Sequence, residues 1–332
     1  MIKVVHIHRQ HRNGAYSIET LFHTISEELR NQGVMVIDYE LGSRAHILSD
    51  LRSLRLIDAD VFHITGDVNY LVGFLPRSKT VLTVHDIGHY LFGLKGWRRL
   101  VYKWLWLTLP MRLAKRVTVV SAATRDHIVK HFSISSERIT VINNCYNPMF
   151  RPVPKMFNNT CPRILQVGSK PYKNVPRLIR ALHGISCVLV VVGELDEAIR
   201  EALCETGVVC ENYIGLGQEA LLQQYVVADL VAFVSIGEGF GVPIIEAQAT
   251  GRSLITANIP PMSVVAGDRA CLVDPTDVAS IRAGIFKIIR EETYRNQLVS
   301  DGLQNVEQYS PQTIAQNYLC LYHELINSKE SN

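Results

Sequence analysis

The stretch SIGEGFGVPIIEAQATG, residues 235–251, combines alternating glycines with two glutamates eight positions apart, Glu238 and Glu246. Alternating glycines let backbone N–H groups approach a phosphate, and the start of a helix attracts anions. An ionised carboxylate only accepts hydrogen bonds, so each glutamate needs a partner that donates them. Hydroxyl groups on either side of a diphosphate would meet that need, which describes a nucleotide sugar. The structural alternative is an ordinary glycine turn followed by a helical glutamate.

The residues around this stretch predict a strand, a glycine loop and a helix. The run LVAFVS at 230–235 is typical of a buried strand, Pro243 suits a first helical turn, and Gly251 suits a helix end. Ligands of open α/β sheets bind at the carboxyl ends of strands. The spacing G-x-G-x-G differs from the dinucleotide fingerprint, and the chain has no phosphate-binding P-loop motif.

Short apolar runs alternate with helical segments along the chain, which predicts parallel sheets covered by helices on both faces. Residues 147–162 hold four prolines without a usable period and predict a linker. We therefore expect an α/β protein of two doubly wound, Rossmann-like domains that face each other across a cleft. The expected domains are residues 1–150 and 151–310, and the last helix, within 311–332, should return to the first domain. Two helical segments, at about 277–291 and 312–328, are expected to close the chain.

Composition excludes several classes of protein. The net charge of +3 is too small to indicate nucleic-acid binding, and seven cysteines without a CxxC pair predict reduced thiols, not a disulfide framework or a zinc site. No apolar run reaches the ~18 residues of a membrane-spanning helix, and the N-terminus does not resemble a signal peptide. We expect a cytoplasmic protein, either soluble or peripheral on a membrane.

The motif EGFGVPIIEAQATG closely resembles the E-x7-E signature of retaining glycosyltransferases of family 4, which have the GT-B fold. The resemblance continues through VGSKPYKNVPRLIRAL, VVVGE and YVVADLVAFVS, and it is looser in the first half of the chain. It implies that Glu238 contacts the donor sugar in catalysis and that Glu246 binds the ribose. The other donor contacts that it implies are Gly168, Ser169, Lys170, Gly193, Tyr213, Ile214, Gly239, Phe240, Gly241 and Val242.

Lys173, within VGSKPYKN, is the best candidate for pairing with the diphosphate, because a cation there would stabilise the charge of the leaving group. Many family members have an arginine directly after the glycine of this motif, where this chain has Ser169. Lys170 is a possible substitute, but a lysine cannot form the bidentate fork of an arginine. A surface lysine is the structural alternative at both positions.

In the first half, His85 and Asp86 follow a predicted strand, and the resemblance implies that His85 faces the transferred sugar. Two other strand-end loops could line the acceptor pocket, through Gly66 and Asp67 in HITGD and through Gly14 in HRNGAYSIE. The chain holds twelve histidines, so a hydrogen-bonded core histidine is the alternative for His85.

Asp58-Ala59-Asp60 spells the D-x-D motif that binds a divalent metal in the other large glycosyltransferase fold. Here it stands directly before a predicted strand, so we interpret it as a cap at the start of that strand. No other cluster of hard oxygen ligands is visible, and we expect no required metal and no cofactor besides the donor.

Between Asp86 and Asp126 the chain has no acidic residue, yet it has eight basic residues and all three tryptophans. Tryptophan mixed with arginine and lysine is typical of a helix at a membrane interface. The alternative is an amphipathic helix that packs on its own sheet. The residues expected at the membrane surface are Trp97, Arg98, Arg99, Lys103, Trp104 and Trp106.

These features predict the transfer of a hexose from a nucleoside-diphosphate sugar to a hydroxyl of a lipid-linked cell-surface glycan, at the inner face of the cell membrane. The form EAQATG resembles mannosyltransferases that use GDP-mannose, and a UDP-sugar stays open. Other possibilities are an epimerase of similar architecture, a nicotinamide-dependent oxidoreductase, and a non-catalytic protein that binds sugar nucleotides.

Overall fold

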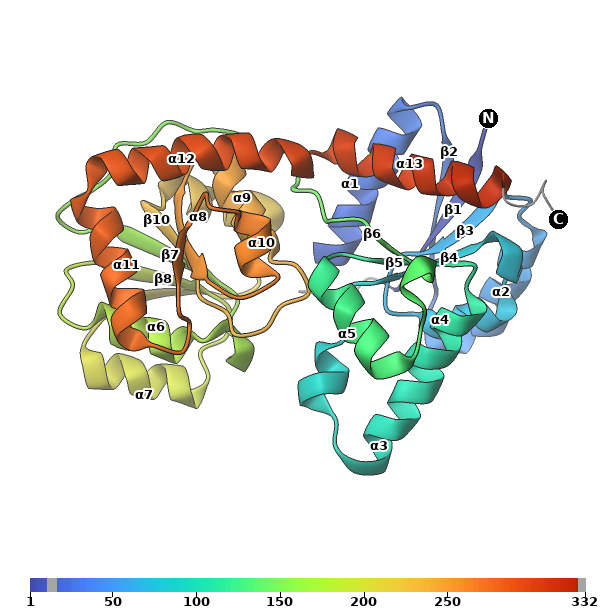
Figure 1. Ribbon diagram of the computed structural model, residues 1–332, viewed down its shortest axis with the longest axis horizontal. Coiled ribbons are helices and arrows are strands. Elements are labelled where there is room, and N and C mark those ends of the chain that lie inside the picture. The colour runs from blue at the N-terminus through green and yellow to red at the C-terminus, as the bar shows by residue number, and fades with distance from the viewer. Residues whose placement is uncertain (11–16, 328–332) are drawn as a thin grey trace. The chain divides into compact units, whose positions relative to one another are not determined.

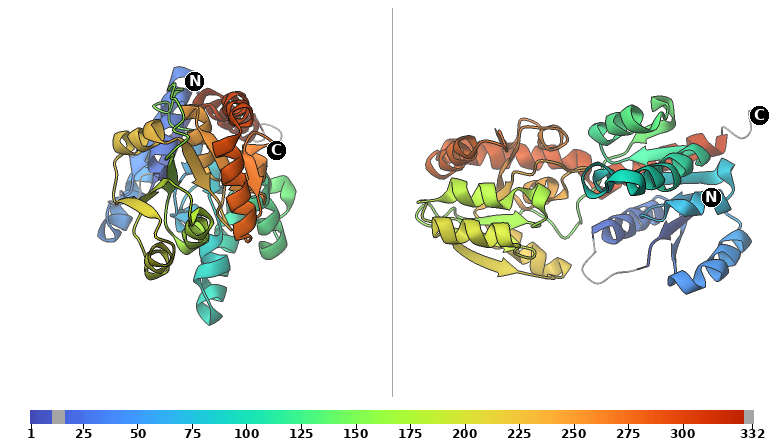
Figure 2. Two further views of the ribbon diagram at one scale, coloured as in Figure 1. Left: turned by 90° about the vertical axis from the view of Figure 1, so that its left-hand side faces the viewer. Right: turned by 90° about the horizontal axis from the view of Figure 1, so that it is seen from below.

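The computed structural model describes residues 1–10 and 17–327 of the chain. The chain forms two compact units, of which the first comprises Met1–Asn147 and Ser310–Asn332 and the second comprises Pro148–Tyr309. In each unit, helices cover both faces of one six-stranded sheet (Figures 1 and 2). The alternating sequence pattern therefore predicts the fold class correctly.

The sheet of the first unit has the strand order β2-β1-β3-β4-β5-β6, and every neighbouring pair is parallel. The direction in which strands are added reverses between β1 and β3, and open α/β sheets bind ligands at such a switch point. The strands are β1 (Lys3–His8), β2 (Met35–Glu40), β3 (Val61–Ile64), β4 (Thr80–Val84), β5 (Arg116–Val119) and β6 (Ile139–Val141).

Two apolar clusters hold the first unit together, one on each face of its sheet. One joins the sheet to α1 and α13 through side chains such as Phe22 and Leu325, so the end of the chain completes the first unit. The other joins the sheet to α2, α4 and α5 through Leu54, Met111 and Phe132. The helices are α1 (Ser17–Asn31), α2 (Ile47–Leu56), α3 (Gly96–Val101), α4 (Leu109–Leu113), α5 (Ala122–Phe132) and α13 (Pro311–Asn327), and the π-helical segment η5 (Tyr102–Thr108) joins α3 to α4.

The second unit has the strand order β12-β11-β10-β7-β8-β9, again fully parallel. The chain builds outward from β7 to β9 and then returns to the other side of β7 with β10, so the switch point lies between β7 and β10. The strands are β7 (Arg163–Val167), β8 (Val188–Val192), β9 (Val209–Tyr213), β10 (Leu230–Phe233), β11 (Ser253–Ala257) and β12 (Cys271–Val273). The helices are α6 (Val175–Leu182), α7 (Glu197–Thr206), α8 (Gln218–Val227), α9 (Val242–Thr250), α10 (Met262–Ala266), α11 (Val278–Arg290) and α12 (Glu292–Val306).

The expectation of two closing helices is wrong, because three helices, α11, α12 and α13, close the chain. The residues of α12 that face the protein include Arg295, Gly302 and Asn305 as well as Leu298. Asn305 donates a hydrogen bond from Nδ2 to Oε1 of buried Gln248 at 2.8 Å. A helix that buries polar groups in this way lacks the apolar period by which helices are predicted.

Candidate active site

The carboxyl ends of β7 and β10 carry the residues of the predicted donor site. Gly168 and Ser169 follow β7, and the glycine loop with Glu238 follows β10. Because β7 and β10 are neighbours in the sheet, their two loops meet at the switch point of the second unit.

Lys173 and Glu238 form an ion pair between these two loops. Lys173 Nζ lies 2.8 Å from Glu238 Oε1, and each side chain is only 12% exposed. The ammonium also lies 4.4 Å from the ring centre of Phe233, at the end of β10. The short helix η7 (Pro171–Lys173) carries the lysine, and Gly168 makes room for its side chain, since a Cβ there would come 2.9 Å from Lys173 Cε.

Three buried polar atoms at these strand ends have no hydrogen-bond partner in the described part of the chain: Gln166 Oε1 on β7, and Ser235 Oγ and Glu238 Oε1 after β10. The contact of Glu238 with Lys173 is close enough for charge attraction but does not have the directionality of a hydrogen bond. Buried polar groups in folded proteins are nearly always paired. Three buried atoms without a hydrogen bond at one switch point, of which Glu238 Oε1 has only the charge of Lys173 beside it, therefore indicate a site for a polar ligand.

Helix α9 starts directly after the glycine loop. Gly241 adopts a φ of +109°, which side-chain-bearing residues rarely adopt, and Pro243 occupies the first turn. The N–H groups and the dipole at this helix start favour an anion. Phe240 points inward and packs edge-on against Tyr309, with ring centres 5.6 Å apart. Only the backbone of Phe240 is therefore available to a ligand, as the predicted backbone contact requires.

Glu246 lies one turn into α9, and the Tyr225 hydroxyl donates a hydrogen bond to its Oε2 at 2.6 Å. Burial raises the pKa of Glu246 to about 7, although the hydrogen bond from Tyr225 and the charge of Lys173 both act to lower it. Both glutamates of the motif and Lys173 thus belong to one electrostatic group.

Gly193, after β8, allows the loop after β7 to approach closely. A Cβ on Gly193 would lie 2.5 Å from Ser169 Oγ and 3.1 Å from the backbone nitrogen of Ser169. Its backbone N–H donates to the carbonyl of Tyr213, which brings the end of β9 to the same edge. Ile214 is 62% exposed and Lys170 is also exposed. Val242 begins α9 and is partly buried.

In the first unit, Gly66, Asp67, His85 and Asp86 lie after β3 and β4. His85 Nε2 lies 2.8 Å from the carbonyl oxygen of Thr65, so Nε2 must carry the proton and Nδ1 is left as an acceptor. Burial lowers the pKa of His85, which favours this neutral ring. Asp67 accepts a hydrogen bond from Trp106, and Gly14 lies outside the described residues.

Hydrogen bonds link three buried side chains in the core of the first unit. The Tyr322 hydroxyl of α13 lies 3.0 Å from His6 Nε2 and 2.7 Å from His63 Nδ1, and all three side chains are fully buried. Burial lowers the pKa of His6 to about 3 and holds the pKa of His63 well below 6.5. Both rings are therefore neutral core histidines at physiological pH.

Among the described residues, one group of three side chains, His6, His8 and Asp38, has the spacing to hold a metal ion. Burial alone would raise the pKa of Asp38, but hydrogen bonds from His8, Ser26 and Arg30 outweigh that effect and lower it. These hydrogen bonds already use the atoms that a metal would need. In the D-x-D stretch, Asp60 Oδ2 accepts the backbone N–H of Lys3 at 2.9 Å, which agrees with a structural cap.

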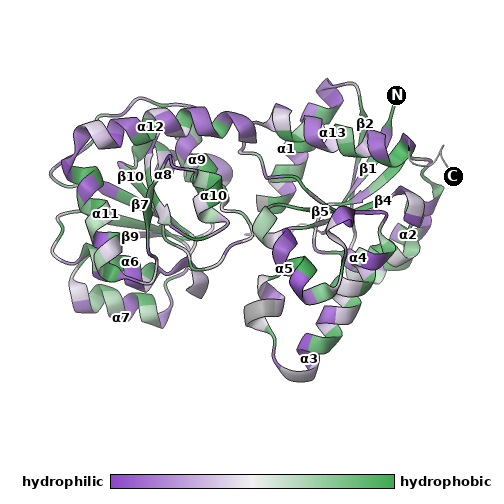
Figure 3. Cartoon of the chain, in the orientation of Figure 1, coloured by the Kyte–Doolittle hydropathy of each residue, from purple (hydrophilic) through white to green (hydrophobic). Residues whose placement is uncertain are grey.

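The basic aromatic segment forms a continuous helical run, residues 96–113, which extends from the first unit with α3 at its far end (Figures 1 and 2). Six apolar side chains on it are exposed, and Figure 3 shows hydrophobic and hydrophilic residues interspersed along the run. None of the helices in the described residues combines the length and apolarity that crossing a bilayer requires. We call the following six residues the exposed apolar face: Trp97, Leu100, Val101, Trp104, Leu105 and Leu109.

Three residues expected at the membrane surface face the protein instead. Trp106 is partly buried against the core of the first unit, Arg99 lies over the Tyr90 ring at 4.5 Å, and Lys103 lies 5.8 Å from the ring centre of Phe132. The expectation is corrected at these positions. Trp97, Arg98 and Trp104 are exposed, as expected.

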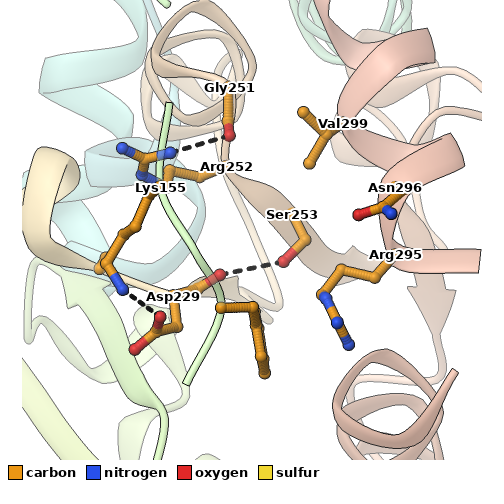
Figure 4. Close-up of a pocket in the computed structure, with 10 residues that line it drawn as sticks. Lys155, Asp229, Gly251, Arg252, Ser253, Arg295, Asn296 and Val299 are labelled. Atoms are coloured by element: carbon orange, nitrogen blue, oxygen red, sulfur yellow. Dashed lines mark hydrogen bonds and ion pairs between the residues drawn. The ribbon is translucent and has the colours of Figure 1, made fainter. Parts of the chain in front are cut away.

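A small pocket in the second unit lies at the other edge of the sheet from the glycine loop (Figure 4). Its residues Asp229 and Ser253 stand at the amino ends of β10 and β11, where Lys155 pairs with Asp229. Arg252 donates to the carbonyls of Tyr225, Val226 and Val153. The residues that line this pocket therefore connect the linker to the sheet, and the pocket is separate from the predicted donor-site residues.

Two family models match the chain. One, described as Glycosyltransferase Family 4, matches residues 37–150, and the other, described as Glycosyl transferases group 1, matches residues 154–304. The chain belongs to the family 4 glycosyltransferases. Its two parallel six-stranded sheets are the two Rossmann-like domains of the GT-B fold.

Proteins that are similar to this chain include mannosyltransferases. The O-antigen chain mannosyltransferase RfbU of Salmonella typhimurium is 28% identical over 222 residues, which are 64% of this chain and 62% of that protein. The O-antigen chain mannosyltransferase B of Escherichia coli is 26% identical over 85% of this chain and 78% of that protein. The MMP alpha-(1->4)-mannosyltransferase of Mycolicibacterium hassiacum is 26% identical over 70% of this chain and 61% of that protein. The chain thus spans about three fifths of the length of RfbU and of the Mycolicibacterium protein.

Solved structures share the fold at low sequence identity. Sucrose-phosphate synthase from Thermosynechococcus elongatus superposes with a TM-score of 0.79 at 16% identity, over 99% of this chain and all of that chain. Anabaena HepE, in complex with UDP and glucose, has a TM-score of 0.77 at 15% identity, over 98% of this chain and all of that chain.

Sequence reasoning missed two features of the candidate site. One is the ion pair between Lys173 and Glu238, which joins two loops far apart in sequence. The other is Tyr225, whose hydroxyl contacts Glu246 from a different helix. Tyr225 begins the stretch YVVADLVAFVS, which was part of the family resemblance. Because its neighbours in this stretch are apolar, the sequence did not indicate that its hydroxyl has a polar role.

Proposed function

We propose that this protein is a glycosyltransferase that moves a hexose from a nucleoside-diphosphate sugar to a hydroxyl of a cell-surface glycan. The observation that carries the proposal is the group at the second unit's switch point. There Lys173, Glu238 and Glu246 surround the start of α9, beside buried polar atoms that lack partners.

In this proposal the diphosphate binds the N–H groups of residues 239–242 and the Lys173 ammonium. Glu246 accepts hydrogen bonds from the ribose hydroxyls, and Glu238 accepts them from the sugar. Glu238 and Glu246 are then occupied as acceptors, so neither serves as a covalent nucleophile. Gly168, Ser169, Gly193 and the end of β9 complete the edge on which the nucleotide rests.

The transfer forms one bond to the anomeric carbon and breaks one. The acceptor oxygen forms a bond to the anomeric carbon as the bond from that carbon to the diphosphate oxygen breaks, and the departing diphosphate takes the acceptor's proton. Lys173 and the helix start stabilise the negative charge that develops on the leaving group. Because the acceptor attacks the face that the leaving group vacates, the product retains the anomeric configuration, which NMR of the purified product would test.

We assign contacts to the acceptor and the transferred sugar to the polar strand ends of the first unit, Gly66, Asp67, His85 and Asp86. His85 Nδ1 is suited to accept a hydrogen bond from a sugar hydroxyl, since the ring is neutral and its proton is on Nε2. We assign no step to a metal ion, so turnover should be unchanged by a chelator.

GDP-mannose is the favoured donor, because several relatives carry the name mannosyltransferase. The test is a panel of GDP- and UDP-sugars, with release of the nucleoside diphosphate measured in the presence of membrane-extracted glycan acceptors. We expect one donor to support turnover and Glu238→Ala to abolish it. If no nucleotide sugar is turned over or bound, or if Glu238→Ala retains full activity, the proposal is wrong.

We further propose that residues 96–113 attach the enzyme to an anionic membrane that holds a lipid-linked acceptor. The six members of the exposed apolar face lie within thirteen residues of one helical run, and Trp97 and Trp104 are 71% and 53% exposed. Arg98 and Arg112 lie 5.9 and 5.7 Å from the ring centres of these two tryptophans. Aromatic groups flanked by cations match the interface of an anionic bilayer.

Sedimentation with phosphatidylglycerol-containing vesicles tests this attachment against pure phosphatidylcholine vesicles. The double substitution Trp97→Ala and Trp104→Ala should abolish binding to the anionic vesicles. Leu48→Ala with Leu56→Ala, a matched exposed apolar pair on α2, should not change it. Equal vesicle binding by all variants, or a dimer in solution that the tryptophan substitutions dissolve, would contradict the proposal.

A further inference from the structure

Tyr225 contacts Glu246, a residue of the proposed donor site, from the neighbouring helix α8. It belongs to α8, its side chain is fully buried, and its hydroxyl donates to Glu246 Oε2 at 2.6 Å. A phenol has a single proton to donate, and here that proton goes to the carboxylate of α9.

The end of α8 that carries Tyr225 is fixed on several sides. Arg252 Nε donates to the Tyr225 carbonyl and Arg252 Nη2 to the Val226 carbonyl, both at 2.9 Å. The last carbonyls of a helix have no partner within the helix, so this guanidinium caps the end of α8. The ring of Phe150 packs edge-on against the Tyr225 ring at 5.2 Å between centres.

A fixed hydroxyl on Oε2 limits how the Glu246 carboxylate can rotate. The hydrogen bond also favours the charged form of the carboxylate over the neutral acid. The ionised form is the one that can accept both hydroxyls of a vicinal diol, because a protonated carboxyl has lost part of its accepting capacity.

We propose that Tyr225 is a positioning residue of the donor site, which orients the Glu246 carboxylate and keeps it ionised for the ribose hydroxyls. The inference rests on the proposed function, since it takes Glu246 as the ribose contact. It extends that function by making nucleotide affinity depend on a residue that itself touches no ligand.

Two opposing effects on the pKa of Glu246 make this role measurable near neutral pH. Burial raises the pKa of the carboxyl to about 7, and the hydrogen bond from Tyr225 acts to lower it. Removal of the hydroxyl should therefore raise that pKa further. Nucleotide affinity in the wild-type enzyme should increase as pH rises through about 7, and the midpoint should move upward when the hydroxyl is lost.

The test is the pH profile of GDP and UDP affinity, measured by titration calorimetry from pH 5.5 to 9 on the full-length enzyme. Tyr225→Phe keeps the ring packing and removes only the hydroxyl. We expect the midpoint to rise by about one unit, affinity to fall about 5-fold at pH 7 and about 10-fold at pH 5.5, and affinity to recover at high pH. Tyr294→Phe removes a phenol hydroxyl from the same unit, where the ring lies under Lys287, and should match the wild type.

The possible results separate the two claims. If the Tyr225→Phe profile superimposes on the wild type, or is weakened equally at every pH, the positioning role is refuted. If Glu246→Ala binds both nucleotides as the wild type does, or neither nucleotide binds the wild type, the proposed function fails. Glu246→Gln should bind weakly with no midpoint near neutrality, because its side chain does not titrate.

Discussion

The ion pair between Lys173 and Glu238 predicts opposite effects of one substitution on two ligands. The glutamate holds the cation that we assign to the diphosphate, and its negative charge repels that diphosphate. Glu238→Gln removes this charge with little change in shape. It should therefore tighten the binding of GDP or UDP, which have no sugar, while it abolishes transfer from the nucleotide sugar.

The size of the effect follows from the geometry. At 2.8 Å the Coulomb attraction of the pair is about 6 kcal/mol for an effective dielectric constant of about 20. Desolvation of two side chains that are each 12% exposed offsets most of it, and we take about 1–2 kcal/mol as the net value. Release of Lys173 should then tighten nucleoside diphosphate binding by about 5- to 30-fold.

Titration calorimetry with the nucleoside diphosphate and a turnover assay with the intact donor measure the two effects on the same preparations. Lys173→Met should weaken nucleotide binding, and Glu205→Gln, which breaks an exposed ion pair with Arg180, should change neither quantity. If Glu238→Gln binds the nucleotide no more tightly than the wild type does, or if it keeps full turnover, the assigned roles of Glu238 and Lys173 are wrong.

Contacts elsewhere in the chain give three further expectations. Gly193→Ala would place a Cβ 2.5 Å from Ser169 Oγ at a φ of +147°, so the unfolding midpoint should fall by several degrees, for a cost of about 1–3 kcal/mol. An unchanged midpoint would contradict the close approach. Tyr322→Phe leaves a ring nitrogen of each of His6 and His63 without its partner, and denaturant unfolding should show a loss of about 1–3 kcal/mol. Because burial lowers the pKa of His6 from 6.5 to about 3, the unfolded chain binds more protons in that range, so stability should fall as pH drops from 6.5 toward 3. A flat thermal midpoint over this range would show that these rings are not buried and neutral.

The regular parts of the fold could be predicted from sequence because local patterns specify them. Apolar runs of strand length mark both sheets, and Pro243 and Gly251 mark the limits of α9. The glycine loop could be located because its alternating glycines stand between a strand and a helix, and Gly241 adopts a φ of +109°. Helix α12 was missed because it buries Arg295 and Asn305 in place of an apolar stripe.

Contacts between distant segments could not be predicted in this way. Nothing local to Tyr225 indicates that its hydroxyl reaches Glu246, and nothing local to Lys173 indicates which loop it meets. The side of the helical run on which each tryptophan lies could not be predicted for another reason. Residues 102–108 are π-helical, so the usual helical period does not assign Trp106 to the correct side.

We propose above that the carboxyl edge of the second unit's sheet binds a nucleotide sugar through backbone N–H groups. Amide hydrogen exchange of the wild-type protein, with and without GDP-mannose or the UDP-sugar that proves to be the donor, tests it most directly. We expect slower exchange in peptides that cover residues 168–175 and 236–246, and unchanged exchange around Asp229 and Ser253 at the opposite edge. Unchanged exchange in both donor-site peptides at saturating donor, or protection confined to the opposite edge, would contradict it.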